Sequence, residues 1–174
     1  MAFARILGAA AVLAWGTMGA LAQTAPATVV DVAAGSPDHT TLVQAVTAAG
    51  LAETLQGEGP FTVFAPTNAA FAALPAGALD DLLKPENKDK LVAVLGCHVV
   101  EAKAMAADVA KMIADGNGTA EITTLGKCRL NATESGGKVM IGGAGGTPVT
   151  VTAADLAAGN GVVHVIDGVL LPAS

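Results

Sequence analysis

The centre of the chain reads FTVFAPTNAAF from Phe61 to Phe71, and this stretch decides the fold. Its first five residues are apolar or β-prone, both those that would point to one face of a strand and those that would point to the other. This pattern predicts a strand buried on at least one face and favours burial on both. Pro66 ends this strand because proline has no N–H to donate to a sheet. Thr67 or Asn68 can then accept hydrogen bonds from the free N–H groups of a short helix that runs to Leu74.

Working outward, helical patterns come first and strand patterns follow. Ser36-Pro37-Asp38 predicts a helix start, and apolar residues recur at helical spacing from there until Gly50. Further helices are predicted at residues 78–83, 85–95 and 108–114, and the mixed-charge run from Lys84 to Lys90 predicts a solvated helix start. Short strands are predicted at residues 97–100, 122–125, 128–132, 138–141, 149–151, 162–166 and 169–171. Because strands and helices do not alternate regularly, the order predicts an α+β fold.

The first 22 residues have the pattern of a secretory signal peptide. A basic start at Arg5 precedes an apolar run from Ile6 to Trp15 and the small-residue site Ala20-Leu21-Ala22. We therefore predict export to the periplasm or extracellular space, with residues 1–22 removed. Residues 23–28 are predicted as a flexible tail, and a short apolar segment at residues 29–32 leads into the domain. No later apolar stretch reaches the roughly 20 residues that span a bilayer, so no transmembrane segment is expected after cleavage.

Charge and aromatic content narrow the classes of partner. The chain has 15 acidic against 9 basic residues, a net charge of −6, and loss of Arg5 with the signal peptide makes it more acidic. This charge disfavours nucleic acids, polyanions and anionic lipid surfaces as partners. The chain has no Tyr, and its one Trp lies in the predicted signal peptide. Binding by aromatic stacking therefore has few residues to use.

The two cysteines, Cys97 and Cys128, are compatible with one disulfide in an oxidising compartment. The alternative is two separate buried thiols. A metal site that combines them with His98 is not expected, because adjacent residues on a strand point to opposite faces. We predict the disulfide, which would close a loop of about 30 residues and stabilise the fold by about 3–4 kcal/mol.

Three segments in the same order resemble the fasciclin (FAS1) domain family. FTVFAPTNAAF is similar to the first signature of that family, LGCHVV from Leu95 to Val100 to its central Tyr-His motif, and NGVVHVIDGVLLP from Asn160 to Pro172 to its second signature. The resemblance covers about residues 29–172. It implies a FAS1 fold, a β-wedge or sandwich of short strands flanked by several α-helices, and a role in cell-surface or matrix adhesion.

The last block can also be interpreted residue by residue. Asn160-Gly161 favours positive backbone angles before a strand, and Asp167-Gly168 favours a tight turn or bulge after it. His98 and His164 lie on predicted strands among apolar residues, where a buried histidine with one satisfied hydrogen bond is the common outcome. His39 is expected to be exposed in the first turn of a helix.

Two positions bear on partner binding. Cys97 stands where the family motif has Tyr, so no role of that phenol carries over to this chain. Asp155-Leu156 stands where some animal members have a short Asp-Ile motif through which they resemble integrin ligands. If binding occurs there, Asp155 is the charged contact and Leu156 the apolar anchor. The alternative interpretation is an acid in the first turn of a helix followed by a core leucine.

No grouping of residues predicts catalysis. After the signal peptide the serines are Ser36, Ser135 and Ser174, and none lies in a nucleophile elbow. The glycine-rich segment at residues 142–146 lacks the ending of a phosphate loop and is predicted as a wide hairpin turn. We therefore predict no enzyme and no cofactor, but an exported adhesion module that binds a surface or matrix protein or polysaccharide. The alternative is a periplasmic module that binds a small ligand and has no adhesive role.

Overall fold

The structure is a computed structural model, and it describes residues 27–143 and 147–171. The predicted signal peptide, most of the predicted tail and the glycines at 145–146 lie outside the described residues. The helices are α1 (Val29–Ala34), η1 (Pro37–His39), α2 (Thr40–Ala49), α3 (Ala52–Leu55), α4 (Asn68–Ala72), α5 (Ala78–Leu83), η2 (Pro85–Asn87), α6 (Lys88–Gly96) and α7 (Ala106–Asp115). The strands are β1 (Phe61–Pro66), β2 (Val99–Val100), β3 (Thr119–Thr123), β4 (Arg129–Ser135), β5 (Lys138–Gly143), β6 (Val149–Ala158) and β7 (Gly161–Ile166).

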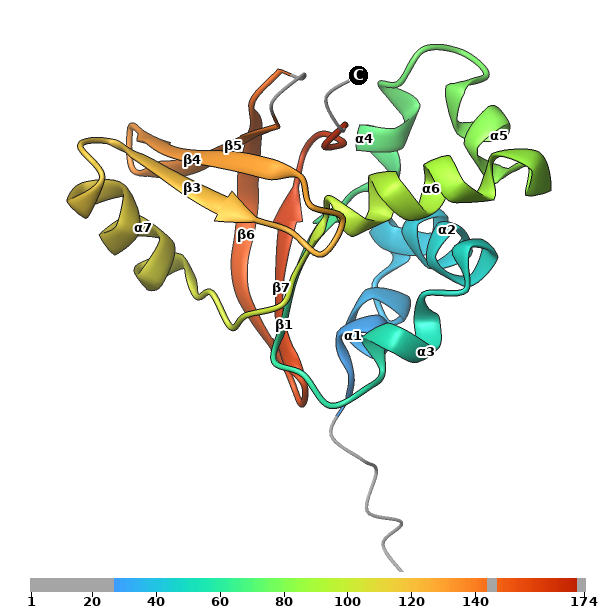
Figure 1. Cartoon of the computed structure of the whole chain (residues 1–174), viewed down its shortest axis with the longest axis horizontal. Coiled ribbons are helices and arrows are strands. Elements are labelled where there is room, and N and C mark those ends of the chain that lie inside the picture. The colour runs from blue at the N-terminus through green and yellow to red at the C-terminus, as the bar shows by residue number, and fades with distance from the viewer. Residues whose placement is uncertain (1–26, 144–146, 172–174) are drawn as a thin grey trace, which may run out of the picture.

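The strands form one seven-stranded sheet in the order β2-β1-β7-β6-β5-β4-β3. The pair β1 and β7, next to the β2 edge, is parallel, and the remaining pairs are antiparallel. The sheet bends into a nearly closed wedge: helices α1 to α6 lie on one side of β1 and β7, and α7 lies near β3 and β4 on the other (Figure 1). The predicted α+β class is confirmed, and a wedge flanked by helices is the architecture that the sequence resemblance implies.

Burial on both faces of β1 produces two cores. Val63 and Ala65 pack with residues of α1, α2 and α6 in a helix-side core. Phe64 points the other way and packs with residues of α7 and β3 to β6 in a wedge core. Val163 of β7 belongs to the helix-side core and Ile166 to the wedge core, so one strand pair separates the two.

Several elements differ from the sequence prediction. Residues 29–34 form a helix because Thr28 and Asp31 make a reciprocal capping box, in which the hydrogen bond from Thr28 N lowers the pKa of Asp31. The segment predicted as a strand at 97–100 begins with the end of α6, and only Val99–Val100 pairs with β1. Residues 169–171 form no strand, because Leu170 N donates to the ring of His98 instead of to a neighbouring strand.

Two local expectations were also wrong. His39 is buried, with 4% of its surface exposed, because η1 packs against α2 and α4. Neither Asn160 nor Gly161 has a positive φ. The glycine is needed for another reason, since a Cβ at Gly161 would collide with the backbone of Phe61 on the paired strand β1.

The structure contains the predicted disulfide between Cys97 and Cys128, whose Cα atoms are 5.2 Å apart. Cys97 caps the end of α6, and Cys128 precedes β4. A main-chain hydrogen bond from Gly126 N to Gly96 O, 2.9 Å long, lies beside it. The bridge therefore fastens the β3–β4 turn of the wedge to the end of a helix on the opposite side of the sheet.

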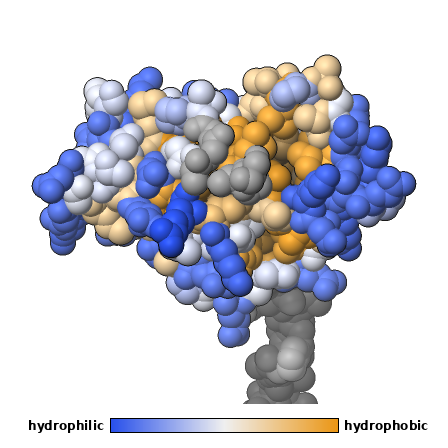
Figure 2. All heavy atoms as spheres, turned by 45° about the horizontal axis from the view of Figure 1, so that its top comes forward, coloured by the Kyte–Doolittle hydropathy of each residue, from blue (hydrophilic) through white to orange (hydrophobic). Residues whose placement is uncertain are grey.

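Charged residues are placed at the periphery. Hydrophilic residues gather at the two ends of the molecule in Figure 2, with apolar residues between them. Lys84 to Lys90 is exposed apart from a half-buried Asn87, as predicted for a solvated helix start. An ion pair between Lys84 and Asp81 in this region, 2.6 Å long, raises the pKa of the lysine and lowers that of the aspartate.

Candidate functional site

His164 of β7 lies inside the wedge and connects three segments. Its ring is buried and stacks on Phe64, with 5.6 Å between the ring centroids. Nε2 is 2.7 Å from the carbonyl oxygen of Ala104, and a carbonyl can only accept, so Nε2 carries the proton. Nδ1 is then the acceptor for the N–H of Asp155, 3.3 Å away. His164 therefore has two hydrogen bonds rather than the one expected from sequence.

Asp155 lies in an irregular part of β6. The pairing with β7 shifts register between Val151 and Leu156, and Asp155 has a φ of 58°, which few non-glycine residues adopt. Its Oδ1 accepts a 2.8 Å hydrogen bond from Ala106 N, the first residue of α7. First-turn N–H groups have no partner within their own helix, so Asp155 on β6 acts as a cap for α7 from outside the helix. The interpretation as an acid in a helical turn was wrong, since the segment is a strand.

Thr62 completes the attachment of α7 to the sheet. Its buried hydroxyl donates to Ala102 O and accepts from Ala104 N at 2.8 Å. The segment that leads into α7 is thus held by β1 through Thr62, by β7 through His164 and by β6 through Asp155. Sequence reasoning missed Thr62, although a hydroxyl within the apolar run FTVFA was a signal for a buried polar contact.

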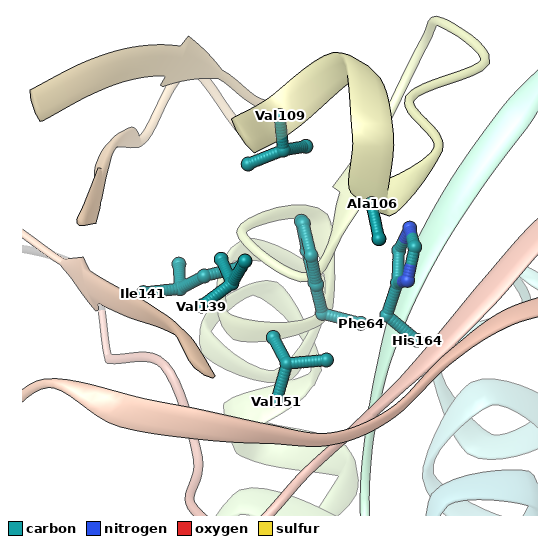
Figure 3. Close-up of a pocket in the computed structure, with 7 residues that line it drawn as sticks. All are labelled: Phe64, Ala106, Val109, Val139, Ile141, Val151 and His164. Atoms are coloured by element: carbon teal, nitrogen blue, oxygen red, sulfur yellow. The ribbon is translucent and has the colours of Figure 1, made fainter. Parts of the chain in front are cut away.

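The space beneath α7 is filled. Phe64 and His164 line it together with aliphatic side chains from α7, β5 and β6 (Figure 3). Its free volume is about 10 Å³, and an apolar hollow among α1, α2, α3 and β1 has about 20 Å³. Either volume holds about one water. Neither apolar hollow has room for a small organic ligand.

The outer part of β6 has the opposite character. Residues 152–157 are all exposed, and Leu156 has 40% of its surface exposed, so it is not the core leucine considered from sequence. β5 pairs with β6 only at Val149 and Thr150, so among the described residues no strand pairs with the β5-facing edge of β6 beyond them. Asp155 and Leu156 therefore share a surface strand, with the aspartate bound internally and the leucine available for contact.

His98 is buried at the junction between the two cores. Its Nδ1 is 2.7 Å from Val94 O, and Nε2 accepts from Leu170 N at 2.9 Å. Burial lowers the pKa of His98 to about 4, although the hydrogen bond to Val94 opposes this shift. A neutral ring is required, because Nε2 must remain an acceptor. His98 therefore fixes the end of α6 to the chain after β7, and it does not meet His164 in a shared site.

The remaining motif residues each tie separate segments together. Thr67 caps α4 by accepting from Ala70 N at 3.2 Å. Asn68 does not cap that helix: its Oδ1 accepts from Thr41 N, and its Nδ2 donates to Pro37 O. Asp167 accepts from Thr150 N through Oδ1 and donates its own N–H to Thr150 O. These contacts are structural and lie apart from Asp155 and His164.

Asn160 organises the lower end of the molecule. Its Oδ1 accepts from Val29 N at 2.9 Å, and its Nδ2 donates to Leu55 O and Gly57 O at 2.6 and 3.0 Å. Around it lies an open groove of mixed polar and apolar lining, formed by two adjoining hollows of about 540 and 180 Å³. This groove is larger than either apolar hollow, and no residue pattern predicted it.

The described residues contain no group of three or more His, Cys, Asp or Glu side chains arranged to hold a metal ion. None of their helices has the length and apolar character needed to cross a membrane.

Comparisons with known proteins place these features in context. A family model described as the Fasciclin domain matches residues 37–172. Protein sll1483 of Synechocystis is 52% identical over 145 residues, which cover 83% of this chain and 73% of that protein. The pig transforming growth factor-beta-induced protein ig-h3 is 36% identical over 145 residues, covering 83% of this chain and 19% of that protein. The immunogenic protein MPB70 of Mycobacterium bovis is 34% identical over 145 residues, covering 80% and 66%.

A solved structure agrees with the fold. The FAS1 domain pair of the insect cell adhesion molecule Fasciclin I superposes with a TM-score of 0.58 at 22% sequence identity. The match covers 73% of this chain and 43% of that chain. At this identity the match supports the fold alone.

Proposed function

Because this chain belongs to the fasciclin domain family, we propose that it is an exported module that mediates cell-surface or matrix adhesion by binding a protein or polysaccharide. The resemblance of residues 1–22 to a signal peptide supports export to the periplasm or extracellular space. The structural relative is a domain pair from a cell adhesion molecule. The proposal assigns the chain no catalytic activity.

The observation that carries this proposal is the exposed segment of β6 at residues 152–157. A strand within a sheet normally buries alternate side chains, yet all six residues here are exposed. Leu156 is the large apolar side chain among them, and an apolar anchor surrounded by small and polar residues is typical of a binding surface. The small neighbours Ala153, Ala154 and Ala157 leave its side chain accessible to a partner.

Asp155 and Leu156 then have different roles. The Asp155 carboxylate already accepts from Ala106 N, so it positions the bulge and the start of α7. Leu156 makes the contact with the partner. This division replaces the expectation that Asp155 is the charged contact.

The test is retention of the purified protein by immobilised envelope proteins and surface polysaccharides from cells that produce it. We expect Leu156→Ser to lose most of its retention. Met112→Ser is the matched control, because Met112 is equally exposed at 41% but lies on α7. If Leu156→Ser and the native protein are retained equally, and circular dichroism shows that both are folded, the assignment of this surface is refuted.

A small-ligand function has no comparable support. The two apolar hollows hold about 10 and 20 Å³, whereas sites for small organic ligands have volumes of about 300–1,000 Å³. The larger hollow beside Asn160, of about 540 Å³, is open to solvent and does not enclose a ligand.

A further inference from the structure

The open groove around Asn160 lies where two chain connections meet at the lower end of the molecule. The turn between β6 and β7 and the connection from α3 to β1 lie side by side there (Figure 1). The two hollows share Gly59, Gly159 and Asn160, so they adjoin along these residues. The groove begins at Ala158, two residues beyond Leu156, and is therefore continuous in sequence with the exposed part of β6.

The walls of the groove are fixed before any ligand arrives. The side chain of Asn160 bonds to the start of α1, to the last residue of α3 and to Gly57 in the α3–β1 connection. Phe61 N donates to Asn160 O at 3.0 Å, and Gly159 N donates to Ala27 O at 2.7 Å. A Cβ at Gly59 would collide with Asn160 O, so the two connections are in direct backbone contact. A groove of this kind loses little conformational entropy on binding.

The lining is hydrogen-bonding and has no large apolar side chain. Lys103 stands in one hollow and Glu58 in the other, with Thr28 and Gln56 nearby. Both charged side chains are exposed, and neither forms a salt bridge with another described residue. Protein partners usually bury aromatic or aliphatic anchors, and this groove offers no pocket for them. Hydroxyl groups suit it better, because each can donate to Glu58 or accept from Lys103.

Charge decides between neutral and acidic ligands. The chain carries a net charge of −6, and Lys103 is the one cation in the lining. A polyanion would gain one attraction and meet the repulsion of the remaining surface. An uncharged sugar chain meets no such repulsion, and the exposed ring of Pro60 provides an apolar surface for one sugar face.

We propose that this groove binds an uncharged polysaccharide, with Lys103 and Glu58 hydrogen-bonding to its hydroxyl groups. The proposal rests on the adhesive function proposed above and selects the polysaccharide from the two classes of partner named there. Because the lining lacks an aromatic platform, binding of a single short chain is weak, and firm adhesion comes from many copies on one polymer.

The test is an NMR titration of the isotope-labelled protein with two probes, cellohexaose as the neutral oligosaccharide and hexagalacturonate as the acidic one. We expect cellohexaose to shift the amide signals of Gln56 to Gly59 and of Gly159 and Asn160. Hexagalacturonate should bind more weakly. Lys103→Ala should weaken cellohexaose binding by about tenfold, because a charged hydrogen-bond donor is lost. Lys111→Ala is the matched control, with the same charge change on the exposed face of α7.

Three results would overturn the proposal: no shifts with cellohexaose, shifts confined to other surfaces, or equal weakening by the two lysine variants. Tighter binding of hexagalacturonate would also refute it, because the charge argument would then be wrong. These failures are distinct from failure of the adhesive function. If Leu156→Ser abolishes retention but cellohexaose shifts no signal of the groove, the adhesive surface on β6 stands and the groove is excluded as a polysaccharide site.

Discussion

The two sides of the parallel strand pair β1 and β7 are held in different ways. On the helix side, aliphatic residues of α1, α2 and α6 cover Val63 and Val163. On the wedge side, α7 packs Val109 and Ile113 into the core, but its start is fixed by polar contacts from Thr62, Asp155 and His164. The first side depends on periodic apolar residues close in sequence. The second depends on single side chains that bond to distant backbone.

The largest effect is expected from removing an aromatic ring on either side. Phe64→Ala should destabilise the protein by about 4 kcal/mol, since a buried phenylalanine leaves a cavity when truncated. Phe71→Ala, on the helix side, should cost a similar amount. Hydrogen exchange should separate them, with faster exchange in α7 and β3 for Phe64→Ala and in α2 and α4 for Phe71→Ala. The same pattern in both variants would mean that the two sides unfold as one unit.

The disulfide tests whether the two sides are coupled. Cys97→Ala combined with Cys128→Ala should lower the free energy of unfolding by about 4 kcal/mol, because the bridge closes a loop across a sequence separation of 31 residues. Urea unfolding of the native protein with reductant should give the same loss. If urea unfolding changes from one transition to two when the bridge is removed, the disulfide is what couples the two sides. An unchanged midpoint would contradict this prediction.

The pH dependence of stability sharpens the role of the junction. His98 is held neutral in the folded protein with a pKa of about 4, and its ordinary value is 6.5. Between these values the unfolded chain binds a proton that the folded protein does not. The contribution of neutral His98 to the free energy of unfolding is therefore fully present above pH 6.5. It is lost as the pH falls toward 4, which lowers the free energy of unfolding by about 3 kcal/mol.

The measurement is the free energy of unfolding at intervals across this range for the native protein and for His98→Gln. Glutamine keeps a donor and an acceptor but does not titrate, so its curve should lack this component of the slope. Parallel curves for the two proteins would show that His98 does not contribute.

The smallest effect is expected at the cap of α7. Asp155→Ala should cost about 1 kcal/mol, the usual value for loss of a capping side chain. The amide of Ala106 should exchange faster, while α2 stays protected. Asp155→Asn should restore the protection, since its side-chain oxygen can still accept. Failure of Asn to rescue would show that charge, not capping, is the contribution of Asp155.

The comparison also explains which features the sequence could predict. Strand β1 and helix α2 with Gly50 as its end follow from local periodicity and turn chemistry, and both were predicted closely. The site depends on bonds across long separations, such as Leu170 to His98 and Val29 to Asn160. No local pattern encodes these, so residues 169–171 were mistaken for a strand, and Asn160-Gly161 was expected to have the positive backbone angles that the structure lacks. The groove was missed because main-chain geometry, not side-chain identity, shapes it.

The parallel pairing of β1 with β7 has a consequence for the order of events during synthesis. β1 lies in the first half of the chain, and its partner along every residue from Phe61 to Pro66 is the last strand. Both cores include residues of β7, so neither is complete until that strand has been made. Contacts so distant in sequence form slowly. The newly made chain therefore stays incompletely folded until β7 appears, and an incompletely folded polypeptide can still be threaded through a narrow channel.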